Sequence, residues 1–178
     1  MIPFIEICLR RFKYYKQLAD RSFAQLSDND FYYQPDPVSN SLEIIIQHMH
    51  GNMMSRWTNF LSEDGEKTWR QRDEEFTIHH HSRTHLLELW EKGWSCLFDT
   101  LSSMKEDDLQ KTIYIRGEGL TAMDAIIRQM AHYPYHVGQI VYLARMIKKE
   151  SWQNLSIEPG KSAEYNAGSG IKDPARNL

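Results

Sequence analysis

The sequence predicts an all-α protein, a four-helix bundle with long connections between its helices. Four stretches repeat apolar residues at the helical period, and between them there is no alternating apolar pattern of useful strand length. The length of 178 residues fits a single domain, so we expect residues 1–178 to share one core. Hydrophobic residues make up 41% of the chain, which is enough to build that core.

The first two helices are expected over about residues 3–26 and about residues 40–61. Pro3 suits a first helical turn, because its missing N–H would have no helical partner there. Asn40 and Glu43 have the spacing of a capping box at the start of the second helix. That helix then carries one broad apolar stripe, formed by Leu42, Ile45, Ile46, Met49, Met53, Trp57 and Phe60.

The other two helices are expected over about residues 84–104 and about residues 121–149. The third helix starts near Ser82 or Thr84, since both residue types cap helix N-termini. The fourth opens at Thr121, which an aspartate follows three residues later in an approximate capping box. Its apolar stripe comprises Ile126, Met130, Tyr133, Val137, Ile140, Val141, Ala144 and Ile147.

Two features follow from the C-terminal half of the chain. Pro134 lies inside the fourth helix, where a missing N–H predicts a bend or a local bulge. Residues 150–178 contain few core formers, and we expect a C-terminal extension with Trp152 and Tyr165 as isolated anchors. The sequence leaves open whether this extension lies along the bundle or across a partner.

Composition excludes several classes of protein. The 21 basic and 24 acidic residues give a formal charge of −3, so we expect no nucleic-acid partner. No apolar run approaches the roughly 18 residues of a membrane span, and the start of the chain lacks the features of a signal peptide. Cys8 and Cys96 are too few for a disulfide framework, and we expect both to be inert thiols. These features favour a cytoplasmic protein without a membrane partner.

Histidine is the residue type that points to chemistry. Among the eight histidines, two pairs have i, i+4 spacing: His81 with His85, and His132 with His136. The second pair lies well inside a predicted helix, where four residues rotate a side chain by only about 40°. Both imidazoles therefore project from one face and can bind one transition metal. From the residues alone, a purely structural role for this pair is an equally good interpretation.

A third ligand has two candidates on the second helix. His48 lies among small or polar residues, and His50 lies on the opposite face of the same helix. Periodicity does not choose between them. The run His79, His80 and His81 is interpreted as a solvated loop cluster rather than a site.

A family resemblance adds to these observations. His48, together with the sequence HYPYHVGQI over residues 132–140, resembles the DinB/YfiT-like superfamily of small bacterial helical proteins. The sequences GNMMSRW at 51–57, DGEK at 64–67 and RDEEF at 72–76 are similar to a largely uncharacterised branch of it. The resemblance covers about residues 3–150 in helix order.

The resemblance implies a four-helix bundle that binds one divalent transition metal, Zn, Ni or Fe, through His48, His132 and His136. It thereby selects His48 over His50. It also implies a metal-dependent enzyme, of which thiol-dependent S-transferases are one type. The implied partners are a low-molecular-weight thiol, an electrophilic substrate and a second copy of the chain in a homodimer.

Three imidazoles with an open position are typical of a catalytic metal site, where the ion acidifies a bound thiol or water. The same residues allow a hydrolytic reaction in place of thiol transfer. Charged residues that can line a cleft are Arg56, Arg70, Arg72 and Asp73, although a solvated face or loop salt bridges is the favoured interpretation.

Two non-catalytic alternatives remain. In the first, a metal only stabilises a helical binding protein. In the second, the protein is a metal-free helical oligomerisation module, an interpretation that depends on Trp57, Trp90, Trp94 and Trp152.

Overall fold

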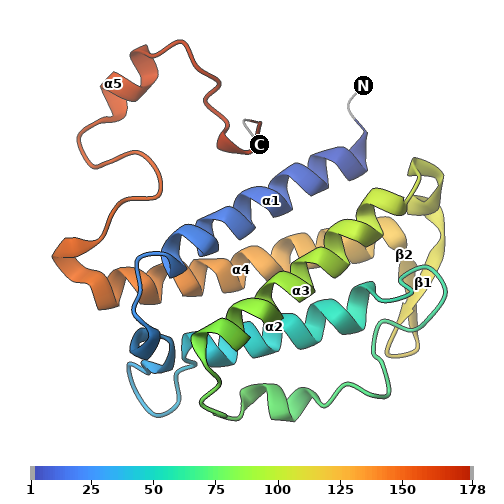
Figure 1. Cartoon of the computed structure of the whole chain (residues 1–178). Coiled ribbons are helices and arrows are strands. Elements are labelled where there is room, and N and C mark those ends of the chain that lie inside the picture. Colours follow the sequence, from blue (N-terminus) through green and yellow to red (C-terminus); the bar gives the residue numbers. More distant parts are fainter. Residues whose placement is uncertain (1–2, 177–178) are drawn as a thin grey trace.

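The structure is a computed structural model, and it describes residues 3–176. The ends of the expected domain, residues 1–2 and 177–178, lie outside the described residues. The chain is mostly helical (Figure 1). Its four long helices are α1 (Phe4–Phe23), α2 (Leu42–Trp57), α3 (Arg83–Ser103) and α4 (Ala122–Lys148). The smaller elements are β1 (Thr112–Ile115), β2 (Glu118–Thr121) and α5 (Ser162–Ala167).

All four predicted helices are present, and the largest boundary error concerns α2. Ser41 rather than Asn40 caps this helix, because its side chain accepts a hydrogen bond from the backbone N–H of Ile44 at 3.3 Å. The helix stops at Trp57 because Thr58 is extended and Asn59 has a φ of 51°. The predicted span of about residues 40–61 was therefore too long at both ends.

The remaining helix ends are closer to prediction. α1 stops at Phe23, three residues early, and continues as a short turn. Ser82 caps α3 through a bond from the N–H of His85 at 3.2 Å, which confirms one of the two expected starts. Thr121 caps α4 as predicted, at 3.1 Å from the N–H of Asp124. α4 continues as α-helix through Pro134, so the expected local bulge is not formed.

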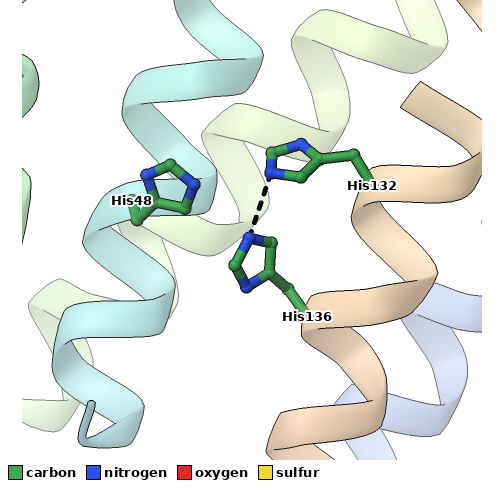
Figure 2. A group of neighbouring side chains, drawn as sticks. All are labelled: His48, His132 and His136. Atoms are coloured by element: carbon green, nitrogen blue, oxygen red, sulfur yellow. Dashed lines mark hydrogen bonds between the residues drawn. The ribbon is translucent and has the colours of Figure 1, made fainter. Parts of the chain in front are cut away.

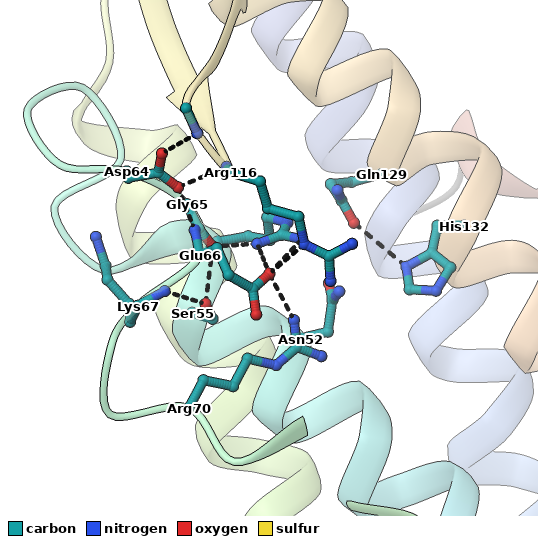
Figure 3. Close-up of polar contacts among 12 residues, drawn as sticks. Asn52, Ser55, Asp64, Gly65, Glu66, Lys67, Arg70, Arg116, Gln129 and His132 are labelled. Carbon is teal, nitrogen blue, oxygen red and sulfur yellow. Dashed lines mark hydrogen bonds and ion pairs between the residues drawn. The ribbon is translucent and has the colours of Figure 1, made fainter. Parts of the chain in front are cut away.

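The sequence showed no alternating pattern of useful strand length, and the structure adds one small hairpin to the predicted helices. β1 and β2 pair antiparallel in a hairpin whose turn residues, Arg116 and Gly117, have φ values of 57° and 76°. Positive φ at both positions is the backbone of a tight two-residue hairpin turn. The Asp64 carboxylate accepts the backbone N–H groups of both turn residues, at 2.8 and 2.7 Å (Figure 3). Each strand has only 4 residues, too few to show a convincing alternating pattern.

The core lies between the four long helices, which run side by side in Figure 1. α1 packs on α3 and α4, and α2 packs on the same two helices. Trp57, Trp90 and Trp94 are fully buried there. Three of the four tryptophans on which the oligomerisation module was based are therefore core residues, and the fourth, Trp152, is partly buried and packs against the core. Trp57 also donates through Nε1 to the Tyr133 hydroxyl at 2.9 Å, which links α2 to α4.

The C-terminal extension returns to α1. Arg11 binds both carboxylate oxygens of Asp173, at 2.7 and 2.6 Å. The side chain of Gln25 exchanges two hydrogen bonds with the backbone of Gln153. The two ends of the extension therefore contact this chain's own α1 and the turn that follows it, whereas residues 156–172, including α5, are exposed and stand away from the bundle (Figure 1). Within residues 3–176, no helix combines the length and apolar character needed to cross a membrane.

Candidate metal site

Three histidines from two helices converge on one point. His48 comes from α2, and His132 and His136 come from successive turns of α4 (Figure 2). One ring nitrogen from each residue lies within 4.8 Å of the other two. Among the described residues, 3–176, this is the one group of three histidine, cysteine or acidic side chains with such spacing. The trio is the set that the family resemblance implied, and it is close enough to hold a metal ion.

The hydrogen bonds of the trio define which nitrogen of each ring is free. Every Nδ1 lies near a side-chain oxygen: 2.9 Å from His48 to Glu75, 2.8 Å from His136 to Gln139 and 3.3 Å from His132 to Gln129. Carboxylate and amide oxygens only accept hydrogen bonds, so each Nδ1 carries the ring proton. Each Nε2 then presents a lone pair, which is the arrangement that metal-binding histidines adopt.

The two Nε2 atoms on α4 provide a test of whether a metal fits. The Nε2 atoms of His132 and His136 are 3.0 Å apart. If both ring protons are on Nδ1, two lone pairs face each other at this distance, and a cation between them would remove their repulsion (Figure 2). Two imidazole nitrogens that each lie about 2.0–2.1 Å from one zinc ion are about 3.3–3.4 Å apart in a tetrahedral site, a few tenths of an ångström more than this separation. The two α4 nitrogens are therefore close enough to share one borderline divalent ion, with a ring nitrogen of His48 within 4.8 Å as the third donor.

Electrostatics keep the two α4 histidines neutral. Burial lowers the pKa of His132 to about 3, and the neighbouring charges of His136, His48, Arg56 and Arg70 act in the same direction. Burial likewise lowers the pKa of His136 to about 4, although its bond to Gln139 opposes the shift. A neutral imidazole is the form that binds a metal, so neither ring needs to lose a proton near pH 7.

Glu75 is the site residue that sequence reasoning missed. It lies in the 3₁₀ turn Arg72–Phe76 between α2 and α3, and it is 9% exposed. Burial raises the pKa of its carboxyl, but bonds from His48 and Arg70 and the charge of Arg70 outweigh this and keep the pKa below its usual value. No periodicity relates Glu75 to His48, since 27 residues separate them. Gln129 and Gln139 were detectable, because each lies three residues from its histidine on one helix face.

The charged residues proposed for a cleft divide into two groups. Arg56 and Arg70 are buried, so the interpretation as a solvated face was wrong for them, whereas ion pairing with a loop is confirmed. Together with Arg116 they surround one oxygen of Glu66, at 3.1, 3.5 and 3.2 Å (Figure 3). The other two, Arg72 and Asp73, are exposed and lie 3.8 Å apart.

The other histidines lie elsewhere. His50 places Nδ1 2.9 Å from the carbonyl oxygen of Leu89 on α3, which separates it from the trio. The loop histidines His79 and His80 are exposed and His81 is partly exposed, as the solvated-cluster interpretation predicted.

Neither cysteine is an activated thiol. Burial, together with the charge of Glu106, raises the pKa of Cys8 to about 11. Burial also raises the pKa of Cys96. Both are free thiols and remain protonated near pH 7, which confirms the expectation that they are inert.

Comparison with known proteins gives one family. No curated protein matches this chain. The model of a family described as a protein of unknown function, DUF1572, matches residues 2–161. This match includes the four long helices, the hairpin and all three histidines of the trio. The chain therefore belongs to the DUF1572 family.

Proposed function

We propose that this protein is a metal-dependent enzyme of the DinB/YfiT-like superfamily, with a four-helix bundle as its scaffold. In this proposal His48, His132 and His136 bind one divalent transition ion, Zn, Ni or Fe. The reaction is the transfer of a low-molecular-weight thiol to an electrophile. The observation that carries the proposal is the convergence of three Nε2 lone pairs whose rings are each held through Nδ1.

The donor set supports a catalytic role. Three protein nitrogens leave at least one coordination position of a divalent ion open, as in catalytic zinc sites. His132 is only half-buried, whereas His48 and His136 are 7% and 8% exposed. Exposed aromatic rings flank the site: Phe76 lies 5.0 Å from His48 and Tyr135 lies 4.8 Å from His136, between ring centroids. These rings offer an apolar surface to the organic part of a substrate.

The chemistry divides between the ion and the chain. A bound divalent ion supplies Lewis acidity that lowers the pKa of a coordinated thiol or water. The chain keeps His132 and His136 neutral, and Gln129 and Gln139 fix the orientation of these rings. In the transfer, sulfur forms a bond to the electrophilic atom, the thiol proton passes to solvent, and the leaving group departs with its electron pair.

The first experiment measures metal content. Protein purified without a histidine tag is analysed by mass spectrometry for bound metal, with His48→Ala, His132→Ala and His136→Ala alongside. We expect close to one ion per chain in the wild type and loss of most of it in each variant. Full retention of metal by His136→Ala would contradict the site. A screen of small thiols with electrophiles then tests turnover, and a metal-loaded protein inactive with every pair would contradict transfer.

One observation favours a second candidate, a non-catalytic protein that metal stabilises. The trio joins α2 to α4, so an ion there ties two core helices together. This candidate predicts a large drop in melting temperature on chelation and no exchangeable ligand position. Addition of a small thiol to the cobalt-loaded protein separates the two: a new sulfur-to-cobalt absorption band supports the enzyme, and an unchanged spectrum supports the structural role.

A further inference from the structure

Gly51 occupies a position on α2 where a side chain does not fit. A Cβ atom at Gly51 would lie 2.1 Å from Oε1 of Glu75 and 2.6 Å from its Cδ. Gly51 lies three residues after His48, so the two residues share one face of the helix. Its backbone needs no positive φ, and glycine is unfavourable inside a helix. The space that this glycine leaves is filled by the Glu75 carboxylate.

That carboxylate is held from two sides. Arg70 donates from Nε to Oε1 at 2.7 Å and from Nη2 to Oε2 at 2.9 Å. Oε2 also accepts the Nδ1 proton of His48 at 2.9 Å. The backbone of the segment is fixed to α2 as well, because the side-chain amide of Gln47 donates to the carbonyl oxygens of Glu75 and Thr77, at 3.3 and 3.0 Å. Glu75 therefore cannot move away from α2 freely.

We propose that Gly51, Glu75 and Arg70 position His48 for metal binding. Arg70 fixes the carboxylate of Glu75 in the space above Gly51, and the carboxylate holds the Nδ1 proton of His48. The ring of His48 is thereby fixed in the tautomer that presents Nε2 to His132 and His136. This inference deepens the proposed function and rests on the metal site.

The hydrogen-bond acceptor at Nδ1 of His48 is chemically different from the acceptors at Nδ1 of His132 and His136. His132 and His136 are held by neutral amides of their own helix, and His48 is held by an anion from a separate segment. A charged acceptor makes a stronger hydrogen bond than a neutral amide does, and so holds the donating ring more firmly. Loss of such an outer partner typically weakens metal binding by about 10–100-fold.

The central variant is Gly51→Ala, which displaces Glu75 without altering any metal ligand or hydrogen-bonding group. The matched control is Gly138→Ala, two residues from His136 on α4, because a Cβ there meets nothing within 4 Å. Zinc affinity is measured by competition with a chromogenic chelator. We expect Gly51→Ala to bind zinc about 10–100-fold more weakly than wild type, and Gly138→Ala to bind it equally well.

A second pair of variants shows whether Gly51 acts through Glu75. Glu75→Ala removes the carboxylate, and the double variant Gly51→Ala/Glu75→Ala is expected to bind zinc as Glu75→Ala does. Since Glu75→Ala leaves Arg70 buried without this partner, Glu75→Gln is measured in parallel, and each fold is checked by circular dichroism. Glu75→Gln keeps the shape but not the charge, so we expect it to bind zinc more weakly than wild type.

A readout on metal-free protein separates this inference from the proposed function. In nitrogen-15 spectra of the histidine rings, we expect wild type and Gly138→Ala to show His48 protonated at Nδ1, and Gly51→Ala to show a mixture of tautomers. If wild type binds no zinc but shows this tautomer pattern, the metal site fails and the positioning of His48 stands. If His136→Ala loses zinc while Gly51→Ala and Glu75→Gln bind it as tightly as wild type, the positioning inference is overturned.

Discussion

Two histidine pairs with the same sequence spacing have nearly the same separation between their rings and very different surroundings. The ring centroids of His132 and His136 are 4.7 Å apart, and those of His81 and His85 are 4.6 Å apart. The first pair meets His48, and its Nδ1 atoms are hydrogen-bonded. In the second pair the His85 side chain is 46% exposed, and its Nδ1 lies 3.7 Å from Glu88. Spacing brings two rings together, but a third donor, burial and fixed ring protons make a candidate site.

The largest expected effect separates the two pairs directly. Loss of one ligand from the trio removes a large share of the binding free energy of the ion, so His136→Ala should weaken zinc binding by on the order of 100-fold or more. His81→Ala should leave the tight affinity within about two-fold of wild type. Chelator competition on untagged protein measures both. An equal loss of zinc affinity in His136→Ala and His81→Ala would contradict the assignment of the tight site to the trio.

The next largest effect is a loss of stability of the metal-free protein at acidic pH. The pKa values of His132 and His136 in the folded state, about 3 and about 4, lie below the value of about 6.5 in the unfolded chain. Below pH 6.5 the unfolded state therefore takes up protons that the folded state does not. The contribution of these two rings to the free energy of unfolding is fully present above about pH 7. It is lost as the pH falls from 6.5 toward 4.

Urea unfolding at pH 7.5 and pH 5 measures this loss in the free energy of unfolding. We expect a decrease in wild type and a clearly smaller one in His132→Asn/His136→Asn. The matched surface variant, His81→Asn/His85→Asn, should resemble wild type. A pH dependence that survives in the first variant would contradict the burial of neutral rings at the site.

A smaller effect on zinc affinity distinguishes Gln129 from Gln139, the side-chain amides that hold two histidines of the trio. Gln139 lies 2.8 Å from Nδ1 of His136, and Gln129 lies 3.3 Å from Nδ1 of His132. The shorter contact is the better hydrogen bond, so Gln139→Ala should reduce zinc affinity by up to about 10-fold and Gln129→Ala by less. Titration with the same chelator tests the order. The reverse order would mean that these bonds do not hold the rings.

The smallest expected effect is weak binding at the surface. His79, His81 and His85 have neighbouring rings but no shared buried position. At excess zinc we expect wild type to bind additional ions weakly. His79→Ala/His81→Ala should lose only that weak phase in calorimetry. Loss of the high-affinity binding phase in this variant would show that the main zinc site lies in the loop that carries His79 and His81.

The sequence predicted those parts of the molecule that depend on local spacing. Apolar stripes located the four helices, and the i, i+4 rule located His132 and His136 because both lie on α4. The start of α2 was predicted at Asn40 from its spacing to Glu43, but the residue after it, Ser41, is the cap. The hairpin was missed because two short strands carry almost no periodic signal.

Contacts between distant segments could not be predicted in this way. The choice of His48 over His50 came from the family resemblance, since two residues on opposite helix faces carry equal periodic weight. Arg70 was interpreted as part of a solvated face or a loop salt bridge, and Glu75 was given no role. Only the path of the loop between α2 and α3 brings both side chains next to α2. Burial of charge in a loop depends on partners from elsewhere in the chain, which a local pattern does not contain.

The most direct test of the shared metal ion is an anomalous difference map from crystals of untagged protein. Data collected above and below the absorption edge of the bound metal identify the element and locate it. The structure predicts one strong peak about 2.0–2.1 Å from the Nε2 atoms of His48, His132 and His136. A strong peak only among His79, His81 and His85, or none between α2 and α4 in zinc-soaked crystals, would contradict it.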